Sequence, residues 1–246
     1  MKQVVILGAT SAIAQQVARL LAADGVEMLL VGRSLERLEL LRSDLQARGA
    51  AQVWLLVTDL VDAADPRSIL MSARTKLPEF DTVLIAHGTL LEQEQTQIDP
   101  ALARREIENN FTSVVALATA FAGHFEQRGG GTLAVISSVA GDRGRKSNYV
   151  YGAAKAGVSV FLEGLAARVH ASGVRVLDIK PGPVDTPMTV SLKKSALFAT
   201  PQRVAADIYG ALKSNKSGVV YTPWFWRWVM RAVRAVPTPI MRKLNF

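Results

Sequence analysis

The 246-residue sequence contains no cysteine. This absence excludes disulfide bonds and thiolate ligands for a metal ion. Histidine is also scarce, because only His87, His124 and His170 are present, and they are too scattered to suggest a metal-binding triad. We therefore expect no metal in this protein.

Acidic residues are almost missing from the last quarter of the chain. Residues 187–246 contain ten basic side chains and one acidic residue, Asp207, whereas residues 1–186 contain 19 basic and 20 acidic side chains. The net charge of +8 therefore arises in the C-terminal part. A basic block of this kind favours an anionic partner, which could be a membrane surface, a phosphorylated substrate or a nucleic acid.

The start of the sequence lacks the charged, apolar and cleavage segments of a signal peptide, because a strand pattern begins by residue 3. We expect a cytoplasmic protein. The sequence also lacks internal repeats and low-complexity tracts.

Short apolar runs alternate with longer amphipathic stretches along the chain. Seven runs are typical of strands: QVVILG, EMLLVG, VWLLVT, TVLIAHG, TLAVISS, VRVLDIKPG and GVVYTP. Helices are expected near residues 12–24, 34–48, 66–77, 99–127, 149–171 and 201–214. This order predicts an α/β protein with a doubly wound, Rossmann-type fold, in which helices cover both faces of a seven-stranded parallel sheet. No boundary divides residues 1–222, so we expect one dinucleotide-binding and catalytic domain there.

Residues 223–246 form a basic, tryptophan-rich extension. Arg227, Arg231 and Arg234 would form one stripe of an amphipathic helix. Apolar residues lie largely away from this stripe, at Phe225, Val229, Val233 and Val236. The helix is too short and too charged to span a bilayer. It could lie on an anionic membrane surface, or it could belong to the main domain and cover the substrate cleft or a subunit contact.

Two loops suggest a dinucleotide site. The first strand ends in LGATSAIA, a glycine-led turn that opens a helix and suits a pyrophosphate. The second strand ends in VGRS, which places Arg33 and Ser34 where a dinucleotide site accepts or rejects a 2′-phosphate. Arginine favours the phosphate and hence NADP(H), unless Arg33 only begins a solvated helix.

The stretch SNYVYGAAKAG contains a candidate for acid–base chemistry. Tyr151 and Lys155 are four residues apart and share a helix face, whereas Tyr149 points elsewhere. An ammonium about 4 Å from the phenol would contribute roughly 4 kcal/mol at an effective dielectric constant near 20. We therefore expect Lys155 to bring the pKa of Tyr151 from about 10 toward neutrality. Chance spacing remains an alternative for this pair alone.

The motifs YGAAK, ISSVAG and LGATSAIA occur together, and the chain resembles the short-chain dehydrogenase/reductase family over roughly residues 3–222. This resemblance implies a catalytic set of four residues: Asn110, Ser138, Tyr151 and Lys155. Asn109 fits the asparagine position less well than its neighbour. The resemblance also implies contacts with NADP(H) from Gly8, Thr10, Ser11, Ala12, Ile13, Arg33, Ser34, Asp59, Leu60, Ala86, His87, Gly88, Asn110, Tyr151, Lys155, Pro181, Gly182, Val184 and Thr186.

The chain departs from the family pattern in two places. Ala12 and Ala14 stand where the first loop usually has glycine, and His87 replaces an asparagine. Alanine at the third glycine position is an accepted variant, because that position serves helix packing. His87 is expected to be a turn or core histidine rather than a catalytic acid.

The family implies reduction of a ketone, and the serine-to-tyrosine segment and the basic tail narrow the choice. Both are similar to a subgroup of NADPH-dependent reductases that act on a polyprenyl-phosphate-linked 2-keto pentose supplied by a separate flavin oxidase. Arg143, Arg145 and Lys146 would then meet the substrate phosphate, unless they form only a solvated loop.

Other functions remain open at this stage. Another hydrophobic ketone, ketoacyl or steroid-like, is an alternative substrate, and a non-catalytic NADPH sensor is an alternative of another class. A nucleic-acid partner is not expected, because no recognition motif accompanies the basic residues. A homo-oligomer is expected from the family.

Overall fold

A computed structural model describes residues 1–61 and 65–244. Its centre is a seven-stranded parallel sheet in the order β3-β2-β1-β4-β5-β6-β7. The strands are β1 (Gln3–Leu7), β2 (Glu27–Gly32), β3 (Val53–Val57), β4 (Thr82–Ile85), β5 (Gly131–Ile136), β6 (Val174–Pro181) and β7 (Gly218–Thr222). The predicted Rossmann-type α/β fold is confirmed.

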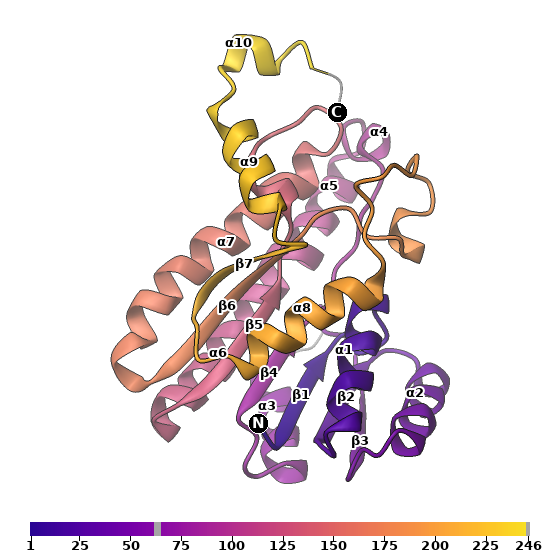
Figure 1. Cartoon of the computed structure of the whole chain (residues 1–246), viewed down its shortest axis with the longest axis vertical. Helices are drawn as coiled ribbons and strands as arrows, with labels where there is room; N and C mark the ends of the chain where they lie inside the picture. Colours follow the sequence, from indigo (N-terminus) through magenta and orange to yellow (C-terminus); the bar gives the residue numbers. More distant parts are fainter. Residues whose placement is uncertain (62–64, 245–246) are drawn as a thin grey trace.

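Two layers of helices cover the sheet because its central strands are apolar on both faces. One core lies between the sheet and the helices α1 (Ala12–Ala23), α2 (Leu35–Ala47) and α8 (Pro201–Lys213). The other core lies beneath α3 (Pro66–Lys76), α6 (Ser113–Arg128) and α7 (Tyr149–Val169). Figure 1 shows α1 and α8 side by side on the near face of the sheet.

The long helix predicted over residues 99–127 is interrupted. It consists of α5 (Pro100–Ile107), a π-helical turn η1 (Glu108–Thr112) and α6. Amphipathic periodicity does not reveal such a turn, which holds one more residue than an α-helical turn. The structure also contains short elements that were not predicted: α4 (Gln93–Thr96), η2 (Val139–Asp142) and η4 (Pro187–Thr189). The helix predicted over residues 149–171 is α7 followed by the short turn η3 (His170–Ser172).

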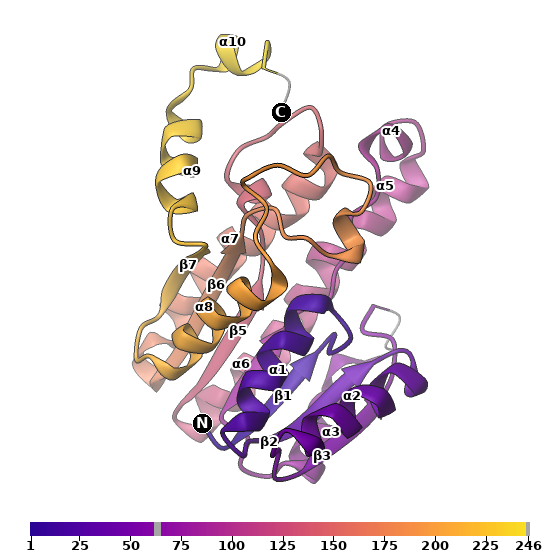
Figure 2. The ribbon, with the colours of Figure 1, turned by 45° about the vertical axis from the view of Figure 1, so that its right-hand side comes forward.

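The C-terminal extension forms α9 (Trp226–Ala235) and α10 (Thr238–Met241). Trp226 and Met230 of α9 are buried against Val139 of η2. Figure 2 shows α9 continuing beyond the carboxyl end of β7, with α10 farthest from the sheet. Within residues 1–61 and 65–244, no helix is both long enough and apolar enough to cross a membrane.

Candidate active site

Apart from Asn110, Tyr151 and Lys155, the expected cofactor residues follow the carboxyl ends of five strands. The loops are Gly8–Ile13 after β1, Arg33 and Ser34 after β2, Asp59 and Leu60 after β3, Ala86–Gly88 after β4 and Pro181–Thr186 at the end of β6. The order of the strands reverses between β1 and β4. Ligands of doubly wound sheets bind outside the carboxyl ends at such a reversal.

Gly8 allows the β1 and β4 loops to meet at this reversal. It has a φ of +80°, and a Cβ atom there would lie 2.6 Å from the backbone nitrogen of His87. Only glycine satisfies both conditions without strain. Ser11 then caps α1 by accepting a hydrogen bond from the Ala14 N–H at 3.2 Å. Ala14 is fully buried in the core, so its methyl group is accommodated by packing.

Two arginines lie at the edge of this loop region. The Arg33 side chain is 73% exposed, and its Nη1 lies 3.5 Å from Asp59 Oδ2. Ser34 caps α2, and Arg37 in the first turn of α2 donates from Nη2 to the Thr10 carbonyl at 3.3 Å. We did not predict a role for Arg37 from the sequence, although it lies one helical turn after Ser34.

His87 is enclosed between the β4 loop and α6. Its Nε2 lies 2.9 Å from Ser113 Oγ, and that hydroxyl donates to the Asn109 carbonyl at 2.9 Å. Because Ser113 uses its proton there, Nε2 must be the protonated ring nitrogen, which leaves Nδ1 buried without a partner. Burial, and then the charge of Lys155, lowers the pKa of His87 to about 3. His87 is therefore neutral at physiological pH.

Ser138, Tyr151 and Lys155 converge beyond the carboxyl end of β5. Ser138 precedes η2, and its Oγ accepts a hydrogen bond from Ala140 N–H at 3.0 Å. Tyr151 lies in the first turn of α7 beside Ser138, whose side chain favours the ionised form of the phenol. Lys155, one turn further along, is buried; its Nζ donates to the Ile136 carbonyl at 3.1 Å and lies 5.7 Å from the Tyr151 ring centroid.

The expected lowering of the Tyr151 pKa is wrong. Burial raises the pKa of Tyr151 to about 12, although the neighbouring Ser138 side chain acts in the opposite direction. Burial also lowers the pKa of Lys155 to about 8. The estimate from helix spacing omitted the desolvation of both groups, which favours their neutral forms. Tyr151 therefore retains its proton at neutral pH.

Asn110 lies in η1 and is fully buried. Its Nδ2 donates to the carbonyls of Thr89 and Glu106 at 3.0 and 3.1 Å, and its Oδ1 accepts from Thr89 N–H at 3.2 Å. These bonds fix the Asn110 side chain and hold the π-helical turn η1 against Thr89 and Glu106. Gly88 lies against both Asn110 and Lys155, which brings β4, η1 and α7 together.

Glu106 is a buried acid that the sequence interpretation missed. It is 1% exposed and accepts hydrogen bonds from Thr89 Oγ1 at 2.7 Å and Leu91 N–H at 3.3 Å. Its charge favours the ammonium form of Lys155. Glu106 directly follows Arg104 and Arg105, which are typical of a solvated helix face, so no sequence pattern indicates that Glu106 is buried.

A buried ionic network supports the loop after Ser138. Lys180 Nζ lies 2.5 Å from Asp142 Oδ1 and 3.6 Å from Asp178 Oδ2. Tyr221 of β7 donates to Asp142 Oδ2 at 2.7 Å, and Ser137 donates to Asp178. The network joins η2 to the final strands and therefore holds the position of Ser138.

Trp226 packs on the loop after β6. It is 6% exposed, and its indole lies so close to Gly182 that any Cβ at this position would overlap the ring. In the same loop, Val184 is buried and bridges to Ala199, and Thr186 caps η4. Arg143 of the expected phosphate loop donates to the Val236 carbonyl at 3.0 Å. The tail is therefore attached to two loops of the site.

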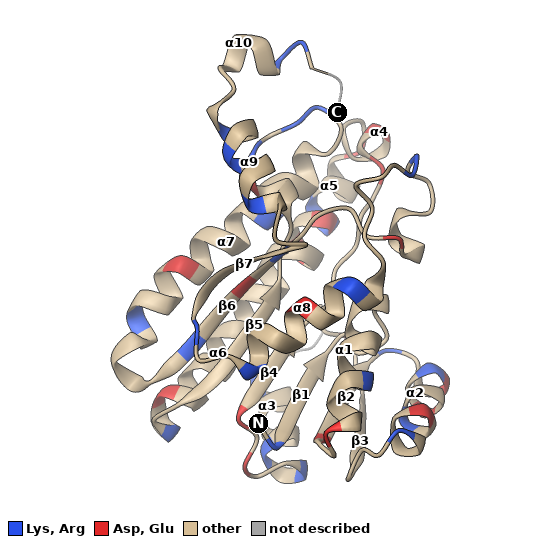
Figure 3. Cartoon of the chain, viewed as in Figure 1, with Lys and Arg blue, Asp and Glu red and all other residues tan. Residues whose placement is uncertain are grey.

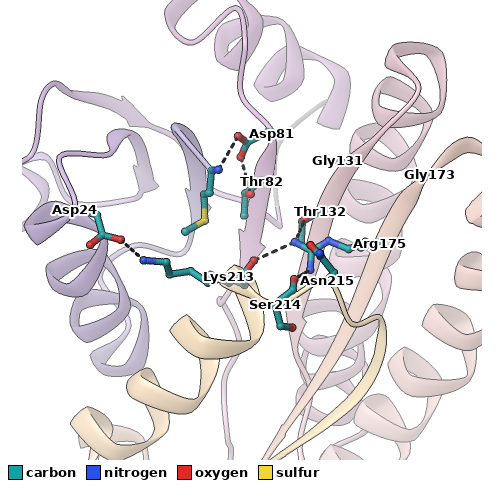
Figure 4. Close-up of a pocket in the computed structure, with 12 residues that line it drawn as sticks. Asp24, Asp81, Thr82, Gly131, Thr132, Gly173, Arg175, Lys213, Ser214 and Asn215 are labelled. Carbon is teal, nitrogen blue, oxygen red and sulfur yellow. Dashed lines mark hydrogen bonds and ion pairs between the residues drawn. The ribbon is translucent and has the colours of Figure 1, made fainter.

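A hollow lies at the amino ends of the strands, at the end of the sheet opposite the candidate active site. The hollow has a volume of about 510 Å³. Figure 4 shows its lining residues, which include Asp24, Asp81, Arg175 and Lys213. Arg175 donates to Thr132 Oγ1 at 2.6 Å and to the Leu212 carbonyl at 3.0 Å, and Lys213 pairs with Asp24 at 3.0 Å. These groups satisfy one another and join the amino ends of the strands to α8.

The arrangement at the carboxyl ends fits a dinucleotide. Gly8 has no side chain, so the β1 loop is free of the steric clash that a Cβ atom would cause. The first turn of α1 contains no acidic residue that would repel a pyrophosphate. Ser138, Tyr151 and Lys155 lie farther along the same carboxyl edge of the sheet. This fold and site define a nucleotide-dependent oxidoreductase.

Comparisons with known proteins agree with this class. Residues 2–196 match the family model for short chain dehydrogenase. An uncharacterized oxidoreductase of Mycobacterium tuberculosis is 37% identical over 241 residues, which cover 98% of this chain and 96% of the relative. An uncharacterized oxidoreductase of Streptomyces coelicolor is 35% identical over 246 residues, covering 99% and 96%.

A solved short-chain dehydrogenase from Sphingobium yanoikuyae, in complex with NADPH, superposes with a TM-score of 0.80. The identity is 24%, and the match covers 100% of this chain and 97% of that one. The chain belongs to the short-chain dehydrogenase/reductase family and is an NAD(P)H-dependent oxidoreductase.

Proposed function

We propose that the protein reduces a ketone with NADPH. The convergence of Ser138, Tyr151 and Lys155 at one edge of the sheet is the observation that carries this proposal. A bound nicotinamide would supply the hydride. Ser138 would donate a hydrogen bond to the carbonyl oxygen as negative charge develops there. Tyr151 would deliver the proton to that oxygen, because it is protonated at neutral pH.

Lys155 and Asn110 would support this proton transfer. Lys155 is mostly charged at neutral pH, since its pKa is about 8, and its ammonium group can stabilise the phenolate that remains. Asn110 would hold a water molecule between Lys155 and solvent, as the family resemblance implies.

NADPH rather than NADH is supported by two exposed arginines. Arg33 and Arg37 lie where the adenosine ribose of a dinucleotide would end, with Asp59 as an acidic neighbour. Arg33→Gln is expected to raise the Kd for NADPH by about tenfold and to leave the Kd for NADH within about twofold. Fluorescence titration would measure both, with Arg67→Gln as a control. Equal weakening of both cofactors would contradict the assignment.

The best substrate candidate is a polyprenyl-phosphate-linked 2-keto pentose such as decaprenylphosphoryl-2-keto-ribose. This choice is supported by the basic tail beside the site and by exposed Trp224 and Trp228, which suit an interfacial position. A flavin oxidase would supply the ketone, the protein would act at the cytoplasmic membrane face, and the product would serve cell-envelope polysaccharide synthesis. We also propose that the protein forms a homo-oligomer. Another hydrophobic ketone is the second candidate.

Three experiments test this proposal. Purified protein, NADPH and membrane extracts would be incubated, and mass spectrometry would seek a lipid-linked product two hydrogens heavier. A parallel panel of ketoacyl, steroid and sugar ketones would follow NADPH oxidation. Turnover of only the small ketones would reassign the substrate, and NADPH binding without any turnover would indicate a sensor. Deletion of residues 223–246 should reduce binding to anionic liposomes; unchanged binding would contradict the interfacial position.

A further inference from the structure

A hollow of about 360 Å³ lies between β7 and the outer face of α9. It is lined by Tyr221, Arg227, Arg231 and Arg234. The three arginines are exposed, whereas the opposite face of α9, with Trp226 and Met230, is buried. The predicted arginine stripe is therefore one wall of a hollow rather than a convex surface.

The positive charge in this hollow is not compensated. Arginines elsewhere, such as Arg19, Arg128 and Arg168, pair with carboxylates. The Arg227 and Arg231 guanidinium groups each lie 5.9 Å from the centroid of the Trp228 ring, and no carboxylate among the described residues forms a salt bridge with Arg227, Arg231 or Arg234. Figure 3 shows basic segments on α9 and directly after α10, and no acidic segment on either helix.

Asp142, the acid that binds Tyr221, does not neutralise these arginines. Asp142 is bound to Tyr221 and Lys180, and its side chain is only 2% exposed. Burial and the bond to Asp142 raise the pKa of Tyr221, which therefore stays neutral. Like charges one helical turn apart destabilise a helix, so a bound anion would stabilise α9.

We propose that Tyr221, Arg227, Arg231 and Arg234 form a binding site for a phosphate ester. Guanidinium groups match phosphate oxygens with paired hydrogen bonds, and three of them converge here. Exposed Trp228 provides an apolar surface beside the charges for the chain esterified to the phosphate. The phosphate could belong to a lipid-linked substrate or to a phospholipid headgroup, and both present the same chemistry.

The site is coupled to the catalytic loop through one hydrogen bond. Tyr221 lines the hollow and bonds to Asp142, which ends the turn that begins directly after Ser138. An occupied site would therefore hold a phosphate ester next to the loop that binds the ketone. This step deepens the proposed function, whereas the phosphate site itself depends only on the geometry of α9 and β7.

The test uses the full chain with all three arginines changed to glutamine. Geranyl phosphate, a short soluble prenyl phosphate, would be titrated while tryptophan fluorescence is followed. The control carries the same loss of charge at exposed positions that line neither hollow: Arg104→Gln, Arg105→Gln and Lys216→Gln. We expect the arginine variant to weaken binding at least tenfold and the control less than twofold. Circular dichroism would verify that both variants fold.

Vesicles distinguish the two sources of phosphate. Sedimentation with phosphatidylglycerol vesicles, compared with phosphatidylcholine vesicles, would be measured for the same proteins. Loss confined to geranyl phosphate supports a substrate phosphate, and loss confined to phosphatidylglycerol supports a headgroup. Equal losses in both triple variants, or no binding of either probe by the unmodified chain, would overturn the site. None of these readouts needs turnover, so failure of the reductase assignment would be seen separately.

Discussion

The indole of Trp226 occupies the space that a side chain at position 182 would need. Gly182 follows β6 in the loop expected to meet the nicotinamide, and Trp226 begins the C-terminal helix α9. The contact joins segments 44 residues apart and makes the tail one wall of the loop. The tail therefore cannot change position without affecting the loop.

Gly182→Ala should destabilise the protein by about 1–3 kcal/mol, because the new methyl group must displace a buried ring. Urea denaturation would measure the change. Gly210→Ala is the matched control: no atom lies within 4 Å of its added Cβ, and a helical alanine should stabilise by about 0.5–1 kcal/mol. If Gly182→Ala did not lower the free energy of unfolding, Trp226 would be shown to move away from the loop without cost.

Tyr151→Phe should lower kcat for ketone reduction by at least about a hundredfold, because the proton donor is removed. The Kd for NADPH should remain within a few-fold. Tyr149→Phe is the control, since Tyr149 is 45% exposed and two residues away. Stopped-flow measurement of NADPH oxidation would compare the variants. Full turnover by Tyr151→Phe would remove Tyr151 from the mechanism.

Acid should destabilise the protein partly through His87. Its pKa is about 3 in the folded chain against 6.5 ordinarily, so the unfolded chain binds a proton between these values and the folded chain does not. Stability should therefore fall as the pH drops from 6.5 toward 3, by at most about 1.4 kcal/mol per pH unit for this group. His87→Asn should reduce this slope in urea titrations at several pH values. A slope unchanged by the substitution would contradict the burial of a neutral imidazole.

Asp142→Asn should cost about 3–5 kcal/mol, because it leaves the buried Lys180 ammonium without its nearest partner. Glu39→Gln on exposed α2 breaks the pair with Arg42 and should cost less than about 1 kcal/mol. Thermal and urea denaturation would measure both. Tyr221→Phe removes only one hydrogen bond of the network and should be milder, which keeps the test valid if Asp142→Asn does not fold. Similar small losses in all three variants would show that the network contributes little.

Much of the fold could be predicted because it depends on local patterns. Valine- and leucine-rich runs between amphipathic segments predict buried parallel strands, and the confirmed sheet contains all seven. The spacing of Tyr151 and Lys155 also predicted their shared face on α7. Such features follow from the periodicity of one segment.

Features that depend on contacts between distant segments could not be predicted. Glu106 is buried because Thr89 and Leu91 bind it, and neither partner is evident from the helix pattern. The docking of Trp226 on Gly182 depends on how β7 directs the tail. The pKa of Tyr151 depends on the desolvation of its surroundings, which the four-residue spacing does not describe.

The widened turn at Glu108–Thr112 holds one residue more than an α-helical turn would. Each residue of an α-helix advances by about 100°, so tightening this turn to α-helical geometry with all its residues kept would rotate α6 relative to α5. Ser113 would then turn away from His87, and the apolar face of α6 would leave the sheet. The additional residue is therefore what allows one continuous helical segment to serve both the site and the core.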